Sequence, residues 1–254
     1  REDNKRAELG KEVWNDWAEG ELNKPEGEPA NVDVNFSGGG LPKIDFSGFI
    51  FPGCANFANV TFNVEANFEG AKFKGDARFE GAIFHRRANF KGTTFEKDAR
   101  FKGATFNGEA DFKGATFENA AHFNNATFED TAIFTDATFK IAPWFRNAGI
   151  HQDTEFSSGK EFFKKQFTDT ESEHSERAYR TLKLAMNKYQ AHTEEAGFFK
   201  LELMARAKKE PPRRKWMYDA YGRFSDYGLS VLRPLYWWAG LGVAMFFLYF
   251  SISG

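Results

Sequence analysis

Residues 66–106 read ANFEGAKFKGD ARFEGAIFHRR ANFKGTTFEKD ARFKGATF, in units of eleven residues. Each unit has the form Ala-x-Phe-x-x-Ala-x-Phe-x-x-x, so phenylalanine recurs at alternating steps of five and six residues. The same spacing includes Phe57, Phe62, Phe68, Phe73, Phe79, Phe84, Phe90, Phe95, Phe101, Phe106, Phe112, Phe117, Phe123, Phe128, Phe134 and Phe139. A repeat this short cannot bury its own apolar side chains, so neighbouring repeats must stack on one another.

The spacing of the apolar residues decides between helix and strand. Ala104 and Phe106 lie two residues apart, as the corresponding pair does in most units. Residues two apart lie on opposite sides of a helix but on the same side of a strand. Glycine also recurs within the repeats, for example at Gly92 and Gly103, and a helix interior disfavours it. The repeats are therefore predicted to form short strands with Ala and Phe directed inward.

The corners between the strands show a residue preference. Two positions after the first Phe of each unit, the sequence has only Gly, Asn or Asp: Asn59, Gly70, Gly81, Gly92, Gly103, Gly114, Asn125, Asp136 and Asn147. These residue types tolerate positive φ. The matching position after the second Phe has no such preference, and one extra residue is present there. We therefore expect left-handed residues at every other corner and bulged corners between them.

The unit resembles that of the pentapeptide-repeat family, Ala-(Asp/Asn)-(Leu/Phe)-x-x. Segments 55–57, 66–68 and 88–90 read ANF, and segment 110–112 reads ADF. The resemblance implies an all-β solenoid, a right-handed quadrilateral β-helix with four strands per coil. Because every second repeat has one extra residue, a coil here needs 22 residues. The resemblance is specific for fold and implies no particular activity.

Four strands per coil place every fourth Phe in one ladder. The first ladder is predicted to hold Phe57, Phe79, Phe101 and Phe123, and to continue to Phe145. The second holds Phe62, Phe84, Phe106 and Phe128, the third Phe68, Phe90, Phe112 and Phe134, and the fourth Phe73, Phe95, Phe117 and Phe139. The periodicity extends to Phe46 and Phe51 at the start and to Ile150 and Phe156 at the end.

The outward positions bear on two unusual functions of solenoids. We expect Thr94, Thr116 and Thr138 on one face and Thr105 and Thr127 on the opposite face. A threonine row suggests ice binding, but β-branched residues also suit strands, and the charged neighbours favour that interpretation. Residues 55–146 carry 12 Lys/Arg and 12 Asp/Glu. A DNA mimic needs a continuous acidic field and a nucleic-acid binder a basic one, so both are disfavoured.

Opposite charges are expected to face each other in successive coils. The predicted pairs are Glu69–Lys91, Lys74–Glu96, Glu80–Lys102 and Glu118–Lys140. Such cross-strand pairs stabilise a sheet weakly.

Changes in composition divide the chain into four segments. Residues 1–33 are predicted to hold an N-terminal helix over 1–19 and a linker, and residues 34–158 the β-helix. Residues 159–212 form the helical region, and residues 213–254 a basic, aromatic juxtamembrane segment and a transmembrane helix. Trp14, Trp17 and Ala18 recur at helical spacing, so the first helix either caps the solenoid or packs on the C-terminal part.

The helical region is predicted to be an α-helical hairpin. Its first helix covers 175–191 and its second 194–209, with Thr193 as the N-cap. The dipeptide Pro211-Pro212 is expected to end it.

The last 21 residues, 234–254, carry no charge and are long enough to span a bilayer. The predicted anchor residues are Tyr236, Trp237, Trp238, Leu241, Phe246, Phe247, Leu248 and Phe250. Lys and Arg outnumber acidic residues just before this segment, so its N-terminal side is predicted to be cytoplasmic. We therefore expect a single-pass protein of the inner (cytoplasmic) membrane; a buried core helix is the alternative. The order of segments also resembles bacterial membrane-anchored pentapeptide proteins.

The sequence shows no catalytic constellation. Cys54 is the single cysteine, the five His residues lack metal-ligand spacing, and there is no phosphate-binding loop. We therefore predict no enzyme activity, no catalytic residue, no metal, no cofactor, no small-molecule substrate and no nucleic-acid partner. The favoured function is a non-enzymatic, membrane-tethered scaffold or protein-binding module, whose protein partner the sequence does not name. The alternative is a homo-oligomeric membrane channel or pore whose cytoplasmic rod senses or gates.

Overall fold

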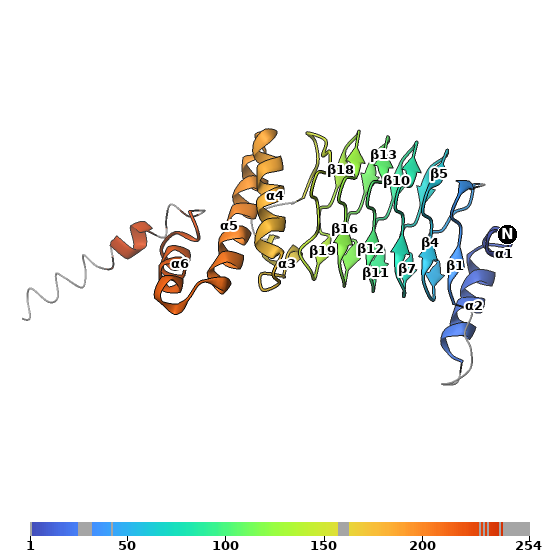
Figure 1. Ribbon diagram of the computed structural model, residues 1–254, viewed down its shortest axis with the longest axis horizontal. Coiled ribbons are helices and arrows are strands. Elements are labelled where there is room, and N and C mark those ends of the chain that lie inside the picture. The colour runs from blue at the N-terminus through green and yellow to red at the C-terminus, as the bar shows by residue number, and fades with distance from the viewer. Residues whose placement is uncertain are drawn as a thin grey trace, which may run out of the picture.

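A computed structural model describes residues 2–24, 32–41, 43–156, 163–228, 230, 232, 234–238 and 240. Its centre is a β-solenoid with helices at both ends (Figure 1). The strands are β1 (Val34–Asn35), β2 (Gly39–Gly40), β3 (Ile50–Phe51), β4 (Ala55–Asn56), β5 (Val60–Phe62), β6 (Ala66–Asn67), β7 (Lys72–Phe73), β8 (Ala77–Arg78), β9 (Ile83–Phe84), β10 (Ala88–Asn89), β11 (Thr94–Phe95), β12 (Ala99–Arg100), β13 (Thr105–Phe106), β14 (Ala110–Asp111), β15 (Thr116–Phe117), β16 (Ala121–His122), β17 (Thr127–Phe128), β18 (Ala132–Ile133) and β19 (Thr138–Phe139).

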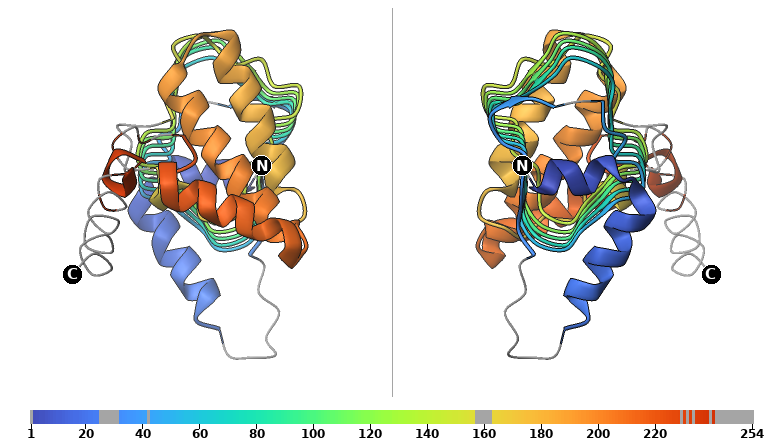
Figure 2. Two further views of the ribbon diagram at one scale, coloured as in Figure 1. Left: turned by 90° about the vertical axis from the view of Figure 1, so that its left-hand side faces the viewer. Right: turned by 90° about the vertical axis from the view of Figure 1, so that its right-hand side faces the viewer.

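The strands form four parallel sheets, one on each side of the solenoid. Sheet A has the order β1-β4-β8-β12-β16, sheet B β2-β5-β9-β13-β17, sheet C β6-β10-β14-β18 and sheet D β3-β7-β11-β15-β19. Ala77 pairs with Ala99 and Ala99 with Ala121, which gives the predicted 22-residue coil. Seen end-on, the coils superimpose (Figure 2). The predicted all-β solenoid with four strands per coil is confirmed, and its right-handed sense stays a prediction from the resemblance.

The sixteen predicted Phe side chains lie in four stacks inside the solenoid. Within each stack, the ring centroids of neighbouring coils are 4.7–5.1 Å apart and the rings are within 9° of parallel. The first and third stacks also meet edge to face, as Phe101 does with Phe90 at 5.3 Å and with Phe112 at 5.4 Å. Such edge-to-face contact is a preferred geometry for aromatic rings.

Two further rings extend the stacks beyond the regular repeats. Phe36 stacks on Phe57 at 4.7 Å, and Phe167 stacks on Phe139 at 5.1 Å. The sequence pattern missed both, because the first coil is one residue short and Phe167 comes later than a 22-residue period allows.

The corners follow the predicted alternation. All nine of the Gly, Asn and Asp residues singled out by the pattern have positive φ, from 55° at Asn59 to 67° at Gly103. In the part of the chain that the structure describes, none of the matching residues at the other corners does. Left-handed backbone therefore explains why only these residue types occur there.

Two short helices cover the first coil. The single helix predicted over 1–19 is instead α1 (Glu2–Glu8) and α2 (Lys11–Leu22), because Gly10 takes a φ of 95° between them. Trp14 packs against Phe36, Phe49 and Phe51, and its indole N–H donates to the carbonyl of Ile50 at 2.7 Å. These helices therefore cap the solenoid, as a terminal repeat with open backbone groups requires.

A helical hairpin covers the last coil. After α3 (Phe163–Gln166), helices α4 (Ser175–Lys188) and α5 (His192–Lys209) lie side by side (Figure 1). The ring of Phe198 meets those of Phe156 and Phe167 edge to face, both at 5.2 Å. The hairpin was predicted, but Thr193 is not its N-cap: α5 begins earlier, and Ala191 occupies that position without a side-chain hydrogen bond.

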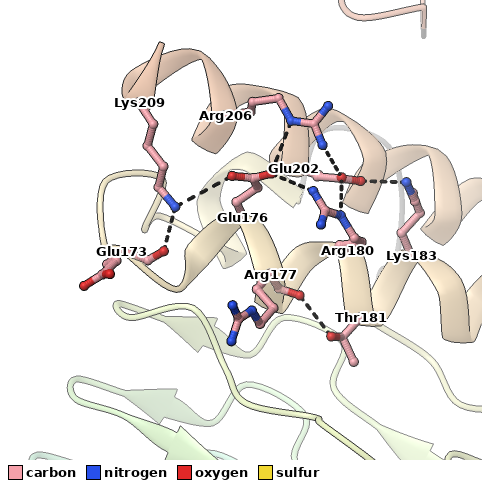
Figure 3. A network of polar contacts seen from close by, with 9 residues as sticks. All are labelled: Glu173, Glu176, Arg177, Arg180, Thr181, Lys183, Glu202, Arg206 and Lys209. Atoms are coloured by element: carbon pink, nitrogen blue, oxygen red, sulfur yellow. Dashed lines mark hydrogen bonds and ion pairs between the residues drawn. The ribbon is translucent and has the colours of Figure 1, made fainter.

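A charged network joins the two helices of the hairpin (Figure 3). The carboxylate of Glu202 is only 4% exposed and accepts hydrogen bonds from Arg180 at 2.8 Å and Lys183 at 2.6 Å. Arg206 donates to Glu202 at 3.0 Å and to Glu176 at 3.2 Å. Burial raises the pKa of Glu202, but the hydrogen bonds and charges of Lys183 and Arg180 outweigh it and leave the pKa below its usual value.

Helix α6 (Pro212–Ser225) follows the hairpin. Its first residue is a proline, which suits the first turn of a helix because no N–H is needed there. The two prolines therefore end the hairpin, as expected, and also begin α6, with Pro211 as the N-cap. Among the residues that the structure describes, no helix is both long and apolar enough to cross a membrane.

Replacing Phe101 by Ala is expected to lower the free energy of unfolding by about 3–5 kcal/mol, because it opens a cavity at the centre of two interleaved stacks. Urea denaturation followed by circular dichroism measures this. Val64→Ala is the matched control, since that side chain is 42% exposed and should change stability by no more than about 0.5 kcal/mol. Equal effects of the two substitutions would contradict the packing described above.

Replacing Glu202 by Gln is expected to weaken the hairpin by about 2–3 kcal/mol at neutral pH, because the buried carboxylate accepts charge-assisted hydrogen bonds from Arg180, Lys183 and Arg206 that a neutral amide cannot replace. Native-state hydrogen exchange of the α5 amides measures this. The pKa of Glu202 is lowered in the folded chain, so its contribution is present above pH 4.5 and is lost as the pH falls through the folded pKa. The difference between wild type and variant should shrink over that range. Glu173→Gln, an exposed side chain in the preceding turn, should leave exchange unchanged at every pH.

Candidate functional site

The solenoid presents four outer faces, and three of them have simple explanations. On sheet D, Thr94 lies beside Thr116, and on the opposite sheet B, Thr105 lies beside Thr127, as predicted. Lys72 and Ile83 interrupt these rows in the preceding coil. These faces are those of ordinary strands with β-branched residues.

The polar side chains of sheet C form hydrogen bonds within the solenoid itself. The side-chain oxygens of Asn67, Asn89 and Asp111 each accept a hydrogen bond from the backbone N–H two residues later, at 3.2, 3.1 and 3.0 Å. Asn89 also donates to Asn67 in the preceding coil at 3.0 Å. This explains the preference for Asn or Asp after the inward Ala, since these residues close their own corners. Sheet C is therefore occupied by structural contacts.

Sheet A carries a different row of side chains. Arg78, Arg100 and His122 are paired in successive coils, and Trp144 continues the row through an isolated bridge with His122. The rings of His122 and Trp144 are 5.9 Å apart. The 22-residue spacing of these four residues is visible in the sequence, and it is the signal from which this row can be found.

Acidic residues hold the arginines of this row in place. Arg100 forms ion pairs with Asp76 at 2.9 Å and Asp98 at 3.1 Å. A hollow of about 270 Å³ lies beside it, lined by Glu80, Asp98, Arg100, Lys102, His122 and Asn124. The guanidinium is thus fixed at the edge of a polar depression that carries charges of both signs.

His122 is a partly buried imidazole in this row. Burial lowers its pKa, against the opposing effect of Asp98, whose carboxylate lies 3.9 Å from the ring nitrogen. The side chain is therefore mainly neutral at pH 7 and offers both a donor and an acceptor nitrogen.

The row continues from the solenoid onto the hairpin. Trp144 stacks on His174, just before α4, with ring centroids 4.4 Å apart and planes 19° from parallel. The ring nitrogen Nε2 of His174 lies 3.0 Å from the carbonyl oxygen of Ala142. A second hollow of about 110 Å³ opens here, lined by Trp144, Phe145, Arg146, His174, Arg177, Ala178 and Thr181. No sequence pattern connects His174 to the repeats, so this junction could not be predicted.

The predicted ion pairs between coils are found in part. Lys91 lies 3.8 Å from Glu69, and Lys74 pairs with Glu96. The other two predicted pairs, Glu80–Lys102 and Glu118–Lys140, lie within the described residues and do not form ion pairs.

The predicted anchor residues divide into two groups. Tyr236, Trp237 and Trp238 are helical and exposed, and the ring of Trp237 lies 4.9 Å from that of Phe224 on α6. Leu241, Phe246, Phe247, Leu248 and Phe250 lie outside the described residues. Within the described ranges, no group of three His, Cys, Asp or Glu residues could hold a metal ion.

Comparison with known proteins agrees with the repeat geometry. The family model described as Pentapeptide repeats (9 copies) matches residues 46–94, 90–138 and 112–159. Neither the curated proteins nor the solved structures include a match to this chain. The matched residues include strands β3 to β19 of the four-sided solenoid and its stacked Phe rings. The solenoid of this chain therefore belongs to the pentapeptide-repeat family.

Proposed function

We propose that the chain is a non-enzymatic, protein-binding rod whose recognition surface is the sheet A face. The observation that carries the proposal is the row of Arg78, Arg100, His122 and Trp144, which continues to His174 on the hairpin. Arg and Trp are enriched at the centres of protein interfaces. The rows on sheets B and D lack such residues in the regular coils, and the polar groups of sheet C are used internally.

Rigidity supports the same face as a binding surface. The row rests on strands whose inward neighbours are fully buried Ala and Phe residues, such as Ala99 and Phe101. Ion pairs to Asp76 and Asp98 hold Arg100. Side chains held in this way lose little conformational freedom on binding, so more of the contact energy appears as affinity. The mixed charges suit a folded partner with both polar and aromatic contacts.

We also propose that the C-terminal segment tethers this rod to the inner membrane, with the solenoid in the cytoplasm. The support comes from the sequence: residues 234–254 carry no charge, and Lys and Arg are in excess immediately before them. A tether at this end leaves the sheet A face along the side of the rod open to a partner.

Partner binding provides the test of the recognition face. We expect Arg100→Ala to weaken association with the co-purifying partner by about 30-fold, since a buried interfacial Arg contributes about 2 kcal/mol or more. Thr116→Ala is the matched control, because this residue is half-buried on sheet D in the same coil. Loss of binding in the Thr116 variant and retention in the Arg100 variant, both folded by circular dichroism, would reject the sheet A face.

Deletion of residues 234–254 tests the tether. The shortened chain should move from the membrane pellet to the soluble fraction after ultracentrifugation and keep its circular dichroism spectrum. A full-length chain washed with carbonate serves as the control and should stay in the pellet. If the shortened chain pellets as strongly as the full one in high salt, the tether proposal is wrong.

A further inference from the structure

Helix α6 rests on α5 through partly buried and mostly small residues, and its charged and large apolar side chains are exposed. Tyr218 and Gly222 are partly buried, and α6 contacts α5. Beyond the end of α6, Asp226 forms an ion pair with Lys200 at 2.7 Å. Contacts from α5 at both places hold the helix in this orientation.

The opposite side of α6 is apolar and exposed. Trp216 is 63% exposed, Met217 55%, Phe224 45% and Tyr221 43%. Their spacing places them on one continuous side of a helix. A helix on the surface of a water-soluble domain has the reverse arrangement, with its apolar side against the core.

Exposed apolar side chains are concentrated at this end of the molecule. Of the fourteen large hydrophobic residues that are exposed in the described part of the chain, nine lie between Trp216 and Trp238. The contact of Phe224 with Trp237 makes the apolar side of α6 continuous with the next helical residues. An exposed apolar patch of this kind marks an interaction site.

Positive charge surrounds the apolar side. Arg213, Arg214, Lys215 and Arg223 lie on α6 with Asp219 as its one acidic residue. A hollow of about 480 Å³ next to the helix is lined by Lys208, Lys215, Asp219, Gly222, Arg223 and Tyr227. Basic residues beside an exposed aromatic and aliphatic face are typical of helices that lie in the interface of an anionic membrane.

We propose that α6 lies flat in the interface of an anionic lipid bilayer. Trp216, Met217 and Phe224 enter the acyl region, and the neighbouring cations contact headgroup phosphates. The charge distribution favours this occupant over a second copy of the chain, since pairing two α6 helices would bring two clusters of like charge together. The contact goes beyond the proposed tether, because it fixes the orientation of the rod relative to the membrane as well as its attachment.

The test places an environment-sensitive fluorophore on the apolar side of α6 in the full chain. Met217→Cys is labelled in a Cys54→Ala background, and Leu184→Cys, on α4 and 60% exposed, is the matched control. Each is mixed with vesicles of phosphatidylcholine alone or of equimolar phosphatidylcholine and phosphatidylglycerol. We expect a blue shift and quenching by brominated acyl chains at position 217 on the anionic vesicles, and no change at position 184. Replacing Arg213, Arg214 and Lys215 by Gln should abolish the shift.

Flotation of the same samples separates this inference from the tether. If the chain floats with the vesicles but the probe at position 217 stays in water, α6 does not bind lipid and the tether stands. If the chain floats only with anionic vesicles and shows the shift, the inference stands and the tether fails. If the chain floats with neither kind of vesicle, both the tether and the lipid contact of α6 are rejected. An equal shift on neutral vesicles, or a shift without lipid that grows with protein concentration, overturns the anionic-membrane assignment.

Discussion

Face-to-face stacking of phenylalanine is the interaction on which the rest of this structure depends. The rings of successive coils lie 4.7–5.1 Å apart, which matches the spacing of hydrogen-bonded strands. Because both spacings agree, the backbone ladders and the aromatic stacks can extend together through the regular coils. In the regular coils, the 22-residue period keeps each Phe directly over the Phe of the coil before it. At the two ends, Phe36 and Phe167 also join the stacks although the spacing there is different.

A fixed period has a consequence for the outside of the molecule. Residues at the same position of successive coils form straight rows, so the sequence of each row determines the chemistry of a whole face. Sheet C uses its row to close corners, while sheet A presents Arg, His and Trp side chains. The stack of Trp144 on His174 then joins this face to the hairpin, so the capping helices add to the surface that a partner meets.

Strict periodicity explains how much of the molecule was predictable from sequence. The four stacks, the coil length and the positive φ at nine corners all follow from residues repeated at fixed spacing. Outside the repeats the helical hairpin was predicted, but several details were missed or wrong. The break at Gly10, the start of α5 before Thr193 and the contact of His174 depend on tertiary packing that no local pattern records. The exposure of the apolar side of α6 likewise depends on how the helix contacts α5.

The most direct test of the account is site-specific photo-crosslinking from each face of the solenoid in turn. A photoreactive residue replaces Arg100 on sheet A, Thr105 on sheet B, Asp111 on sheet C or Thr116 on sheet D, and the covalent products in living cells are compared. These four positions lie within one coil and face its four sides; Arg100, Thr105 and Thr116 are half-buried, and Asp111 is 6% exposed. We expect one dominant protein adduct from position 100. A dominant adduct from another face, with none from position 100, would contradict it.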